Sequence, residues 1–359
     1  MLLIYLILML ISFYLLAKVC EKYFVEALDA IGKQLKLSSE MAGATLMAMG
    51  SSAPELFVSL IAVFRGAGES SNLGAGTIVG SALFNILVII GASALVRKAV
   101  LTWQPVVRDT LFYSFSIIIL LIAFSDGRVT LPEGLFFLAL YAVYVFAVVN
   151  WKKWFGYEEH DPIPDVSKAV EEEEKIFHWW EYITLPIDVS LRFLMNLVGK
   201  NYWAIFATSI LLIISLSWLL VESAVGAAHI LGIPETIIAL TILAAGTSIP
   251  DLLSSLIVAR TGRGGMAISN AVGSNIFDIL FGLGFPWVLL FLIYPERTIT
   301  VDTGNLISSV ILLFATVIAT LFIYIASKWQ VGRKGGALLV LAYIGYLVFI
   351  ISKTLQNGI

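Results

Sequence analysis

Ten stretches of mostly apolar residues, each about 20 residues long, constrain the fold of this chain more than any other feature of its sequence. They centre near residues 10, 52, 85, 116, 140, 212, 245, 280, 315 and 344. Because a bilayer offers backbone amides no hydrogen-bonding partner, segments of this kind cross a membrane as α-helices. The run Met1–Cys20 lacks a basic start and is interpreted as a retained span rather than a signal peptide. The sequence therefore predicts an all-α integral membrane protein with ten transmembrane helices.

The composition excludes several other classes of protein. Of the 359 residues, 59% are hydrophobic and 13% are charged, which is more apolar surface than a soluble chain of this length can bury. The net charge of −3 provides no basic surface for nucleic acid. The single cysteine, Cys20, and three scattered histidines argue against a disulfide framework and a Cys- or His-ligated zinc site.

The distribution of Lys and Arg predicts how the spans are oriented. With the N-terminus outside, about 18 of the 22 basic residues fall in inside loops and about 4 fall outside. We therefore expect a multi-pass cell-membrane protein with extracellular N- and C-termini and a cytoplasmic loop at residues 151–200. The second half of this loop, Ile183–Val198, has the pattern of an amphipathic helix at the membrane surface. The acidic run Glu171–Glu174 is interpreted as part of a solvated linker.

The sequence also contains an internal repeat. Val25–Val63 aligns without gaps to Val221–Ala259. Two pairs of motifs recur in the same order, GSSAPEL with GTSIPDL and GSALFNIL with GSNIFDIL, beginning at Gly50, Gly246, Gly80 and Gly273. Each half holds five predicted spans, an odd number, so the second half must enter the membrane from the opposite side. We expect two inverted five-helix repeats, residues 1–150 and 201–359, with broken helices 2 and 7 at the centre.

Three carboxylates, those of Glu55, Asp251 and Asp278, lie inside otherwise apolar spans. A charge at membrane depth is costly, so such acids usually serve a function and need a compensating charge. No basic residue lies deep in any predicted span, which makes a bound cation or a proton the expected partner. Three acids carry at most −3, which one Ca²⁺ with one K⁺ would neutralise, as would three monovalent ions. A proton on one acid would leave −2, which matches Ca²⁺ alone.

Further oxygen ligands surround the acids. They come from the side chains of Ser51, Ser52, Ser81, Asn85, Thr247, Ser248 and Ser274. Ser51 and Ser52 share a helix face with Glu55, and the same spacing recurs around Asp251. Pro54 and its repeat partner have no amide hydrogen, which frees carbonyl oxygens in the preceding turn. Carboxylate, hydroxyl, amide and carbonyl oxygens are the ligands of Ca²⁺, Na⁺ and K⁺ rather than of zinc.

At these motifs the sequence resembles the calcium/cation antiporter superfamily, whose two repeats carry GSSAPEL-like and GTSIPDL-like signatures. It is most similar to the potassium-dependent sodium/calcium exchanger branch, particularly over Gly246–Trp287. The resemblance implies a ten-helix inverted repeat with four cation sites between helices 2, 3, 7 and 8. It also implies a transport cycle in which helices 1 and 6 slide across the other eight.

Carried over by motif position, the resemblance makes Glu55 and Asp251 the central Ca²⁺ ligands, joined by the backbone oxygens of Ser51 and Thr247. The flanking Na⁺ sites would be completed by Ala48, Ser52, Ser81, Ala244, Ser248 and Ser274. Asn85 and Asp278 would lie nearby. An aspartate at position 278 is linked to K⁺ transport in the potassium-dependent branch, although some microbial exchangers without K⁺ dependence share it.

The predicted function is secondary active exchange of Na⁺ for Ca²⁺, with K⁺ as a candidate co-substrate of Ca²⁺. A proton/calcium antiporter is the main alternative, and the driving gradient distinguishes the two. A cation channel is a more distant alternative, because channels usually place a symmetric ring of ligands between subunits. We expect no enzymatic activity, no resident cofactor, no nucleic-acid partner and no requirement for an oligomer.

Overall fold

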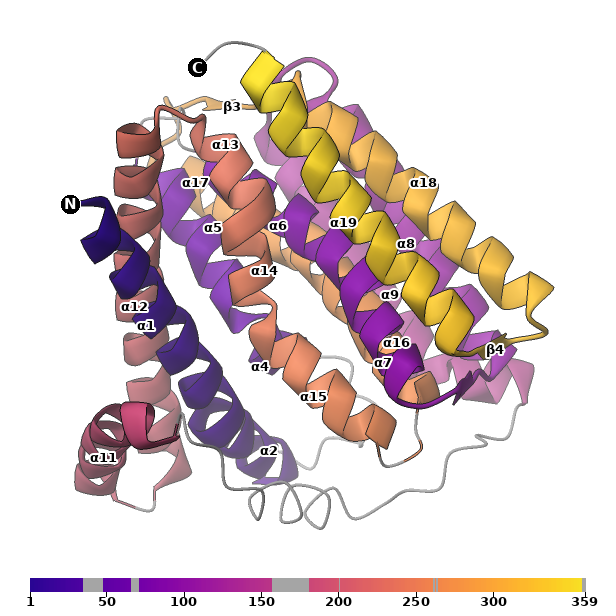
Figure 1. The fold of residues 1–359 in the computed structure, drawn as a ribbon, viewed down its shortest axis with the longest axis horizontal. Helices are drawn as coiled ribbons and strands as arrows, with labels where there is room; N and C mark the ends of the chain where they lie inside the picture. The colour runs from indigo at the N-terminus through magenta and orange to yellow at the C-terminus, as the bar shows by residue number, and fades with distance from the viewer. Residues whose placement is uncertain are drawn as a thin grey trace.

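The computed structural model (Figure 1) describes residues 1–34, 48–65, 71–156, 181–199, 201–260, 262 and 264–356. Within these residues, nine helices are long and apolar enough to cross a membrane. The tenth predicted span, near residue 52, is only partly covered, because residues 35–47 lie outside the described part. The predicted run Glu171–Glu174 also lies outside it. The expected helical architecture is confirmed for the described residues.

The first half of the chain forms a series of helices and π-helical turns. These are α1 (Leu2–Val19), η1 (Cys20–Phe24), α2 (Val25–Gln34), α4 (Ala48–Ser51), α5 (Ala53–Arg65), α6 (Ser71–Phe84), η3 (Asn85–Ile89), α7 (Ile90–Val96), α8 (Trp103–Phe124) and α9 (Leu131–Phe155). Local sequence sets the ends of α9. Thr130 and Glu133 form a capping box at its start, and Gly156 ends it with a positive φ of 50°.

The second half has the same kinds of element. They are α11 (Glu181–Val198), α12 (Tyr202–Leu231), α13 (Glu235–Ile238), η4 (Ala239–Leu243), α14 (Ala244–Thr247), α15 (Ile249–Arg260), α16 (Gly264–Phe277), η5 (Asp278–Leu283), α17 (Gly284–Ile293), α18 (Asn305–Ala326) and α19 (Arg333–Gln356). Asn201 caps α12 by accepting a hydrogen bond from the Trp203 backbone amide at 3.0 Å.

Two helices are interrupted at equivalent places in the repeat. The break falls at Ser52, between α4 and α5, and at Ser248, between α14 and α15. Each break lies two residues before a proline, Pro54 or Pro250, whose ring cannot donate a hydrogen bond to the preceding turn. The interruption exposes backbone and side-chain oxygens in the middle of the helix bundle.

Two of the π-helical turns also begin at equivalent residues, Asn85 for η3 and Asp278 for η5. A π-turn adds one residue to a helical turn and is frequently found at functional sites. Both turns follow a fully helical segment, α6 or α16, and both starting residues are completely buried. The sequence pattern did not predict these turns.

Four two-residue strands, also not predicted, join the halves at opposite ends of the molecule. β1 (Ala99–Val100) pairs antiparallel with β4 (Gln330–Val331), and β2 (Arg128–Val129) pairs antiparallel with β3 (Ile299–Thr300). Figure 1 shows β4 at the lower right and β3 at the top. Each pair links a connection of the first half to a connection of the second half.

Aromatic packing between the halves also occurs in matched pairs. The rings of Phe84 and Tyr343 meet edge to face with centroids 5.4 Å apart, and those of Phe277 and Tyr141 meet in the same way at 5.5 Å. Phe84 and Phe277 hold the same position in the repeated motifs. Correspondingly, α7 packs on α19 and α17 packs on α9. Equivalent residues of the two halves therefore make equivalent contacts.

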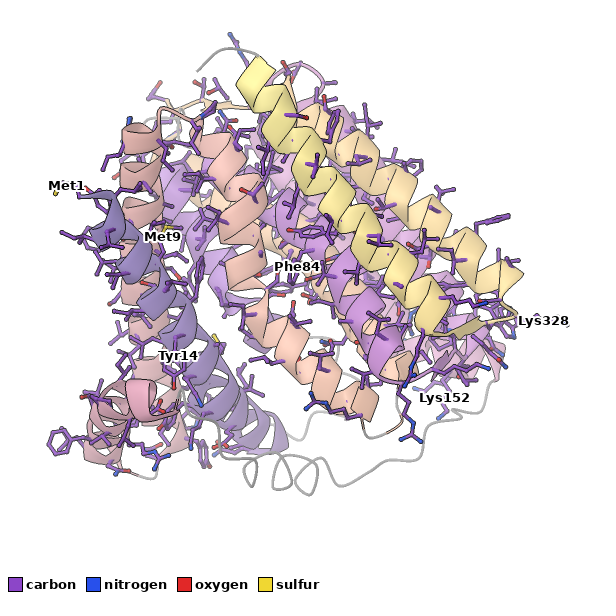
Figure 2. All side chains as sticks on the ribbon, in the orientation of Figure 1. Met1, Met9, Tyr14, Phe84, Lys152 and Lys328 are labelled. Atoms are coloured by element: carbon purple, nitrogen blue, oxygen red, sulfur yellow. The ribbon has the colours of Figure 1, made fainter. Side chains whose placement is uncertain are left out.

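The outer surface of the bundle is apolar. Leu211, Phe322 and Leu341 are 65%, 70% and 63% exposed, and side chains project outward along the helices in Figure 2. Such a surface suits contact with lipid acyl chains rather than water. α1 and α12 lie side by side at one edge of the bundle, and α11 crosses below them in Figure 1.

Candidate cation-binding site

The three predicted acids are fully buried near the centre of the bundle. Glu55 lies in the first turn of α5, Asp251 lies in the first turn of α15, and Asp278 begins η5. Each side chain is 0% exposed. The breaks before α5 and α15 and the turn at η5 therefore place all three carboxylates where the two halves meet.

Hydrogen bonds from serine hydroxyls hold two of the acids, Glu55 from the other half of the chain and Asp251 from its own half. Ser248 Oγ donates to Glu55 Oε1 at 3.1 Å. Ser274 Oγ donates to Asp251 Oδ2 at 2.6 Å, a length typical of a bond to a charged oxygen. Ser52 Oγ lies 2.8 Å from Ser274 Oγ. Since the Ser274 hydrogen is directed to Asp251, Ser52 is the donor in that contact.

Asn85 links the same network to the neighbouring helix. Its Nδ2 lies 3.4 Å from Asp251 Oδ2 and donates to Asn275 Oδ1 at 2.9 Å. Asn275 in turn donates to the backbone oxygen of Ala82 at 3.1 Å and to the hydroxyl of Tyr113 at 3.0 Å. The amides of α16 and η3 therefore connect the central acids to α6 and α8.

Asp278 differs from the other two acids. Neither of its carboxylate oxygens has a hydrogen-bond partner among the described residues. It lies within electrostatic range of both Glu55 and Asp251, and close to Ser52 without forming a hydrogen bond of good geometry. A fully buried carboxylate with two unpaired oxygens needs a partner that the side chains around it do not supply.

Other oxygens around the acids also lack partners within the described part of the chain. They are Oε2 of Glu55, Oδ1 of Asp251, Oδ1 of Asn85 and Oγ of Ser51. No group of three or more His, Cys, Asp or Glu side chains in the described residues is arranged to chelate a metal by itself. A cation here would therefore be held by a mixture of carboxylate, amide and hydroxyl oxygens, which suits a hard cation that is bound and released.

The remaining predicted site residues take less direct positions. The Thr247 hydroxyl lies near Glu55 but donates to the backbone oxygen of Leu243 at 3.0 Å. Ser81 Oγ donates within its own helix, to Ile78 O at 2.9 Å. Ala244 is fully buried. Ala48 begins α4, and its side chain lies outside the described set.

Close packing of α6 on the broken helix depends on one glycine. A Cβ atom added at Gly80 would lie 2.5 Å from the backbone oxygen of Leu240 and 2.6 Å from Cβ of Ala244. Both distances are shorter than any normal contact. Gly80 therefore allows α6, which carries Ser81 and leads into Asn85, to approach the segment that carries Thr247 and Ser248.

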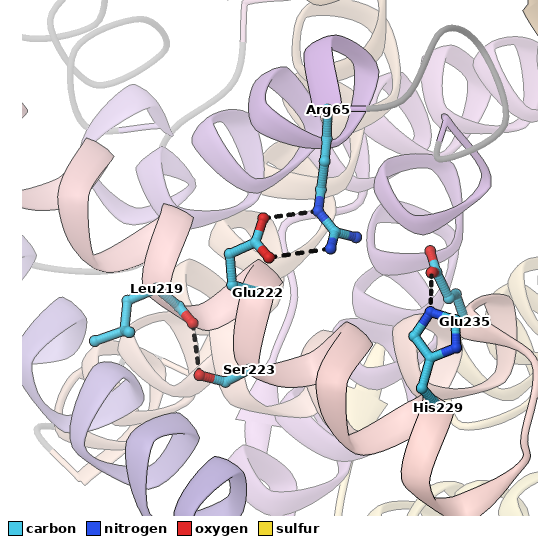
Figure 3. Close-up of polar contacts among 6 residues, drawn as sticks. All are labelled: Arg65, Leu219, Glu222, Ser223, His229 and Glu235. Carbon is cyan, nitrogen blue, oxygen red and sulfur yellow. Dashed lines mark hydrogen bonds and ion pairs between the residues drawn. The ribbon is translucent and has the colours of Figure 1, made fainter.

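Basic side chains pair with acids elsewhere. Arg108 makes a buried ion pair with Asp109 at 2.7 Å. Arg65 binds both carboxylate oxygens of Glu222, at 2.7 and 3.0 Å, at the junction of α5 and α12 (Figure 3). His229 Nε2 lies 3.8 Å from Glu235 Oε1, a contact also drawn in Figure 3. No ion pair of the described residues reaches the three central acids.

One functional candidate, Asn275, did not emerge from the sequence, and neither did Tyr113, whose hydroxyl accepts a hydrogen bond from it. Asn275 and Tyr113 both contact the polar network, and both are fully buried. The position equivalent to Asn275 in the first repeat is Ala82, so comparison of the repeats gave no signal. The one sequence feature that could have identified Asn275 is its position: a polar amide inside an apolar span, next to Ser274.

Comparison with known proteins identifies the family. The model of the family described as sodium/calcium exchanger protein matches residues 5–150 and 201–352. The match covers nearly all of both predicted repeats and omits the loop at residues 151–200. The resemblance to calcium/cation antiporters is confirmed.

Curated relatives agree. The chain is 29% identical to sodium/potassium/calcium exchanger 1 of Gallus gallus, over 98% of this chain and 78% of the relative. It is 28% identical to sodium/potassium/calcium exchanger 4 of Homo sapiens, over 94% of this chain and 79% of the relative. The similarity to the potassium-dependent branch is therefore confirmed across nearly the whole chain.

Solved structures share the fold. The H⁺/Ca²⁺ exchanger CAX superposes with a TM-score of 0.70 at 15% identity, covering 96% of this chain and 82% of that protein. The sodium-calcium exchanger NCX_Mj superposes with a TM-score of 0.57 at 22% identity, covering 97% and 99%. The chain is a multi-pass membrane protein whose family consists of exchangers rather than enzymes. It belongs to the sodium/calcium exchanger protein family.

Proposed function

We propose that the protein exchanges Na⁺ for Ca²⁺ across the membrane by alternating access, and that K⁺ moves together with Ca²⁺. One observation carries this proposal: three fully buried carboxylates share a centre with unpaired oxygens and no basic partner among the described residues. The names of the relatives, sodium/potassium/calcium exchangers, support the choice of ions.

Charge balance explains why such a site exchanges cations. Uncompensated charges in a low-dielectric interior cost several kcal/mol each. The three ionised carboxylates carry a net charge of −3. Ca²⁺ together with K⁺ balances this charge in one direction of transport, and Na⁺ ions balance it in the other. Because the empty, fully charged site is costly to move across the membrane, one set of cations must bind before the other is carried back.

The site residues take roles according to their positions. Glu55 and Asp251 bind Ca²⁺, together with the backbone oxygens of Ser51 and Thr247. Asp278, with two unpaired oxygens, provides the charge for K⁺, next to Asn85. Na⁺ binds at the flanks, at sites formed by Ala48, Ser52, Ser81, Ala244, Ser248 and Ser274.

We propose further that residues 1–150 and 201–359 form two inverted five-helix repeats, ten helices in all, joined by the loop 151–200. The matched breaks at Ser52 and Ser248 and the matched turns at Asn85 and Asp278 support this arrangement. The paired strands at opposite ends of the bundle support it too, because a twofold axis in the membrane plane exchanges the two faces.

The orientation follows from the basic residues. Lys152 and Lys328 lie toward the same end of the molecule in Figure 2, as expected for two cytoplasmic positions. We place both termini outside the cell and the loop 151–200, with α11, inside. One side of α11 packs through Leu191 and Met195, and its opposite side exposes Phe193, as expected for a helix lying on the membrane surface.

We also propose that α1 and α12 move together. Trp203 Nε1, at the start of α12, donates to Gln34 Oε1 at 3.0 Å, and the rings of Phe24 and Phe206 stack at 5.4 Å. Gln34 and Phe24 lie in α2 and η1, which directly follow α1, and α1 itself packs against α12, so the whole segment is held to α12. Every proposed ligand comes from one chain, so this mechanism needs no oligomer.

Transport by purified protein tests the proposal. Proteoliposomes are loaded with Na⁺ and diluted into Na⁺-free buffer, and ⁴⁵Ca²⁺ uptake is followed with and without external K⁺. Uptake that requires both the Na⁺ gradient and K⁺, and is lost in Asp251→Asn, supports the proposal. Uptake that ignores K⁺ would leave a plain sodium/calcium exchanger. Uptake driven by a pH gradient but not by Na⁺ would replace it with a proton/calcium antiporter, and a channel would show conductance without counter-transport.

A further inference from the structure

Asn275 occupies a special place in the central network, because every polar atom of its side chain is in use. Its nitrogen donates to the backbone oxygen of Ala82 at 3.1 Å and to the Tyr113 hydroxyl at 3.0 Å. Its oxygen accepts from the nitrogen of Asn85 at 2.9 Å. The side chain is fully buried, and both of its polar atoms already have partners within the protein.

These bonds fix the orientation of a second amide. A backbone carbonyl can only accept, so the nitrogen of Asn275 must face Ala82 and its oxygen must face Asn85. Only the nitrogen of Asn85 can donate to that oxygen, and the same nitrogen lies 3.4 Å from Asp251 Oδ2. The Asn85 oxygen is then turned away from Asn275, and it has no partner among the described residues.

We propose that Asn275 is a positioning residue: it holds the Asn85 amide so that Asn85 offers its oxygen, not its N–H group, to the transported cation. This inference rests on the proposed function of the site. An amide rotated by half a turn would direct partial positive charge at the cation and would break the contact with Asp251. Without Asn275, both orientations are open to Asn85, and cation affinity falls.

A double-mutant cycle tests the coupling. The apparent KM and Vmax for Ca²⁺ are measured by ⁴⁵Ca²⁺ uptake, and Ca²⁺ binding to the detergent-purified protein is measured by calorimetry. We expect Asn275→Ala to raise both the KM and the Kd about tenfold, the effect of one lost hydrogen bond, with Vmax within about twofold. Asn85→Ala should cause a similar loss, and adding Asn275→Ala to it should cause less than about a twofold further change.

Tyr113→Phe is the matched control. It removes one acceptor of the Asn275 nitrogen but leaves Ala82, so the orientation of both amides is kept. Its KM should stay within about twofold of the wild type. If Asn275→Ala does not elute as a folded, monodisperse protein, Asn275→Ser replaces it in the cycle, since serine cannot reach both neighbours.

Two results would overturn the inference. If the fold increases in KM and Kd of the two single variants multiply in the double variant, Asn275 does not act through Asn85. An equal loss in Tyr113→Phe would mean that packing, not amide orientation, sets the affinity. Failure of the proposed function looks different, because wild-type protein would then show no Na⁺-driven uptake at all.

Discussion

Replacing Asp278 with asparagine tests the charge balance of the site. Asp278 is fully buried, and neither of its oxygens is paired within the described structure, so the substitution removes one negative charge and little hydrogen bonding. Two unit charges about 5 Å apart at an effective dielectric constant of about 20 interact by about 3 kcal/mol. Loss of this attraction should weaken K⁺ binding by about 100-fold. The site then carries −2, which Ca²⁺ alone neutralises.

The assay is the ratio of Na⁺-driven ⁴⁵Ca²⁺ uptake with external K⁺ to uptake with choline in its place. In the wild type the ratio should be large, and in Asp278→Asn it should fall to within about twofold of one while Ca²⁺ uptake persists. Asp109→Asn is the matched control, because Asp109 is also a buried aspartate but is paired with Arg108 outside the site.

The outcome for the control makes the test specific. Asp109→Asn should keep the wild-type K⁺ ratio, whatever its effect on the amount of folded protein. An Asp278→Asn variant that still depends on K⁺ as the wild type does would refute the reasoning, since K⁺ would then be balanced by a charge elsewhere. Loss of all uptake would refute it as well, because Glu55 and Asp251 still carry the two negative charges that balance Ca²⁺.

Three further predictions concern the scaffold. Asp109→Asn should destabilise the protein by about 3 kcal/mol, because it removes the carboxylate that is ion-paired with a buried arginine, and thermal melting in detergent should show the loss. Gly80→Ala should cost about 1–3 kcal/mol in the same assay, whereas Gly345→Ala, where an added Cβ meets nothing within 4 Å, should cost nothing. Arg65→Glu should lower Na⁺-driven uptake, because it places two acids together, and adding Glu222→Arg should restore uptake. If the double variant is as impaired as Arg65→Glu alone, the pair does not couple α5 to α12.

Several parts of the fold could be predicted because they depend on short stretches of sequence. The apolar spans follow from hydrogen-bond requirements in lipid, and nine of them are present in the described residues. The helix breaks follow from Pro54 and Pro250, which act on the turn directly before them. The central position of Glu55, Asp251 and Asp278 follows from the cost of burying a charge, which confines such residues to a shared polar site.

The geometry of the site needed the tertiary structure. Asn85 and Asn275 are 190 positions apart, and Ser52 and Ser274 are 222 apart, so no local pattern pairs them. The two paired strands and the matched aromatic contacts likewise join connections and helices of different halves.

From the sequence alone came a membrane protein with two related halves, three buried acids and a ligand set suited to hard cations. Hydropathy and the cost of buried charge act within single spans, and the repeat is found by aligning two stretches of sequence, so none of them requires knowledge of contacts in space. Only the tertiary structure decided which oxygens of those residues remain unpaired. An amide or hydroxyl is directed by its nearest partner, and in this bundle the partners of Asn85, Ser52 and Ser248 lie on the other half of the chain.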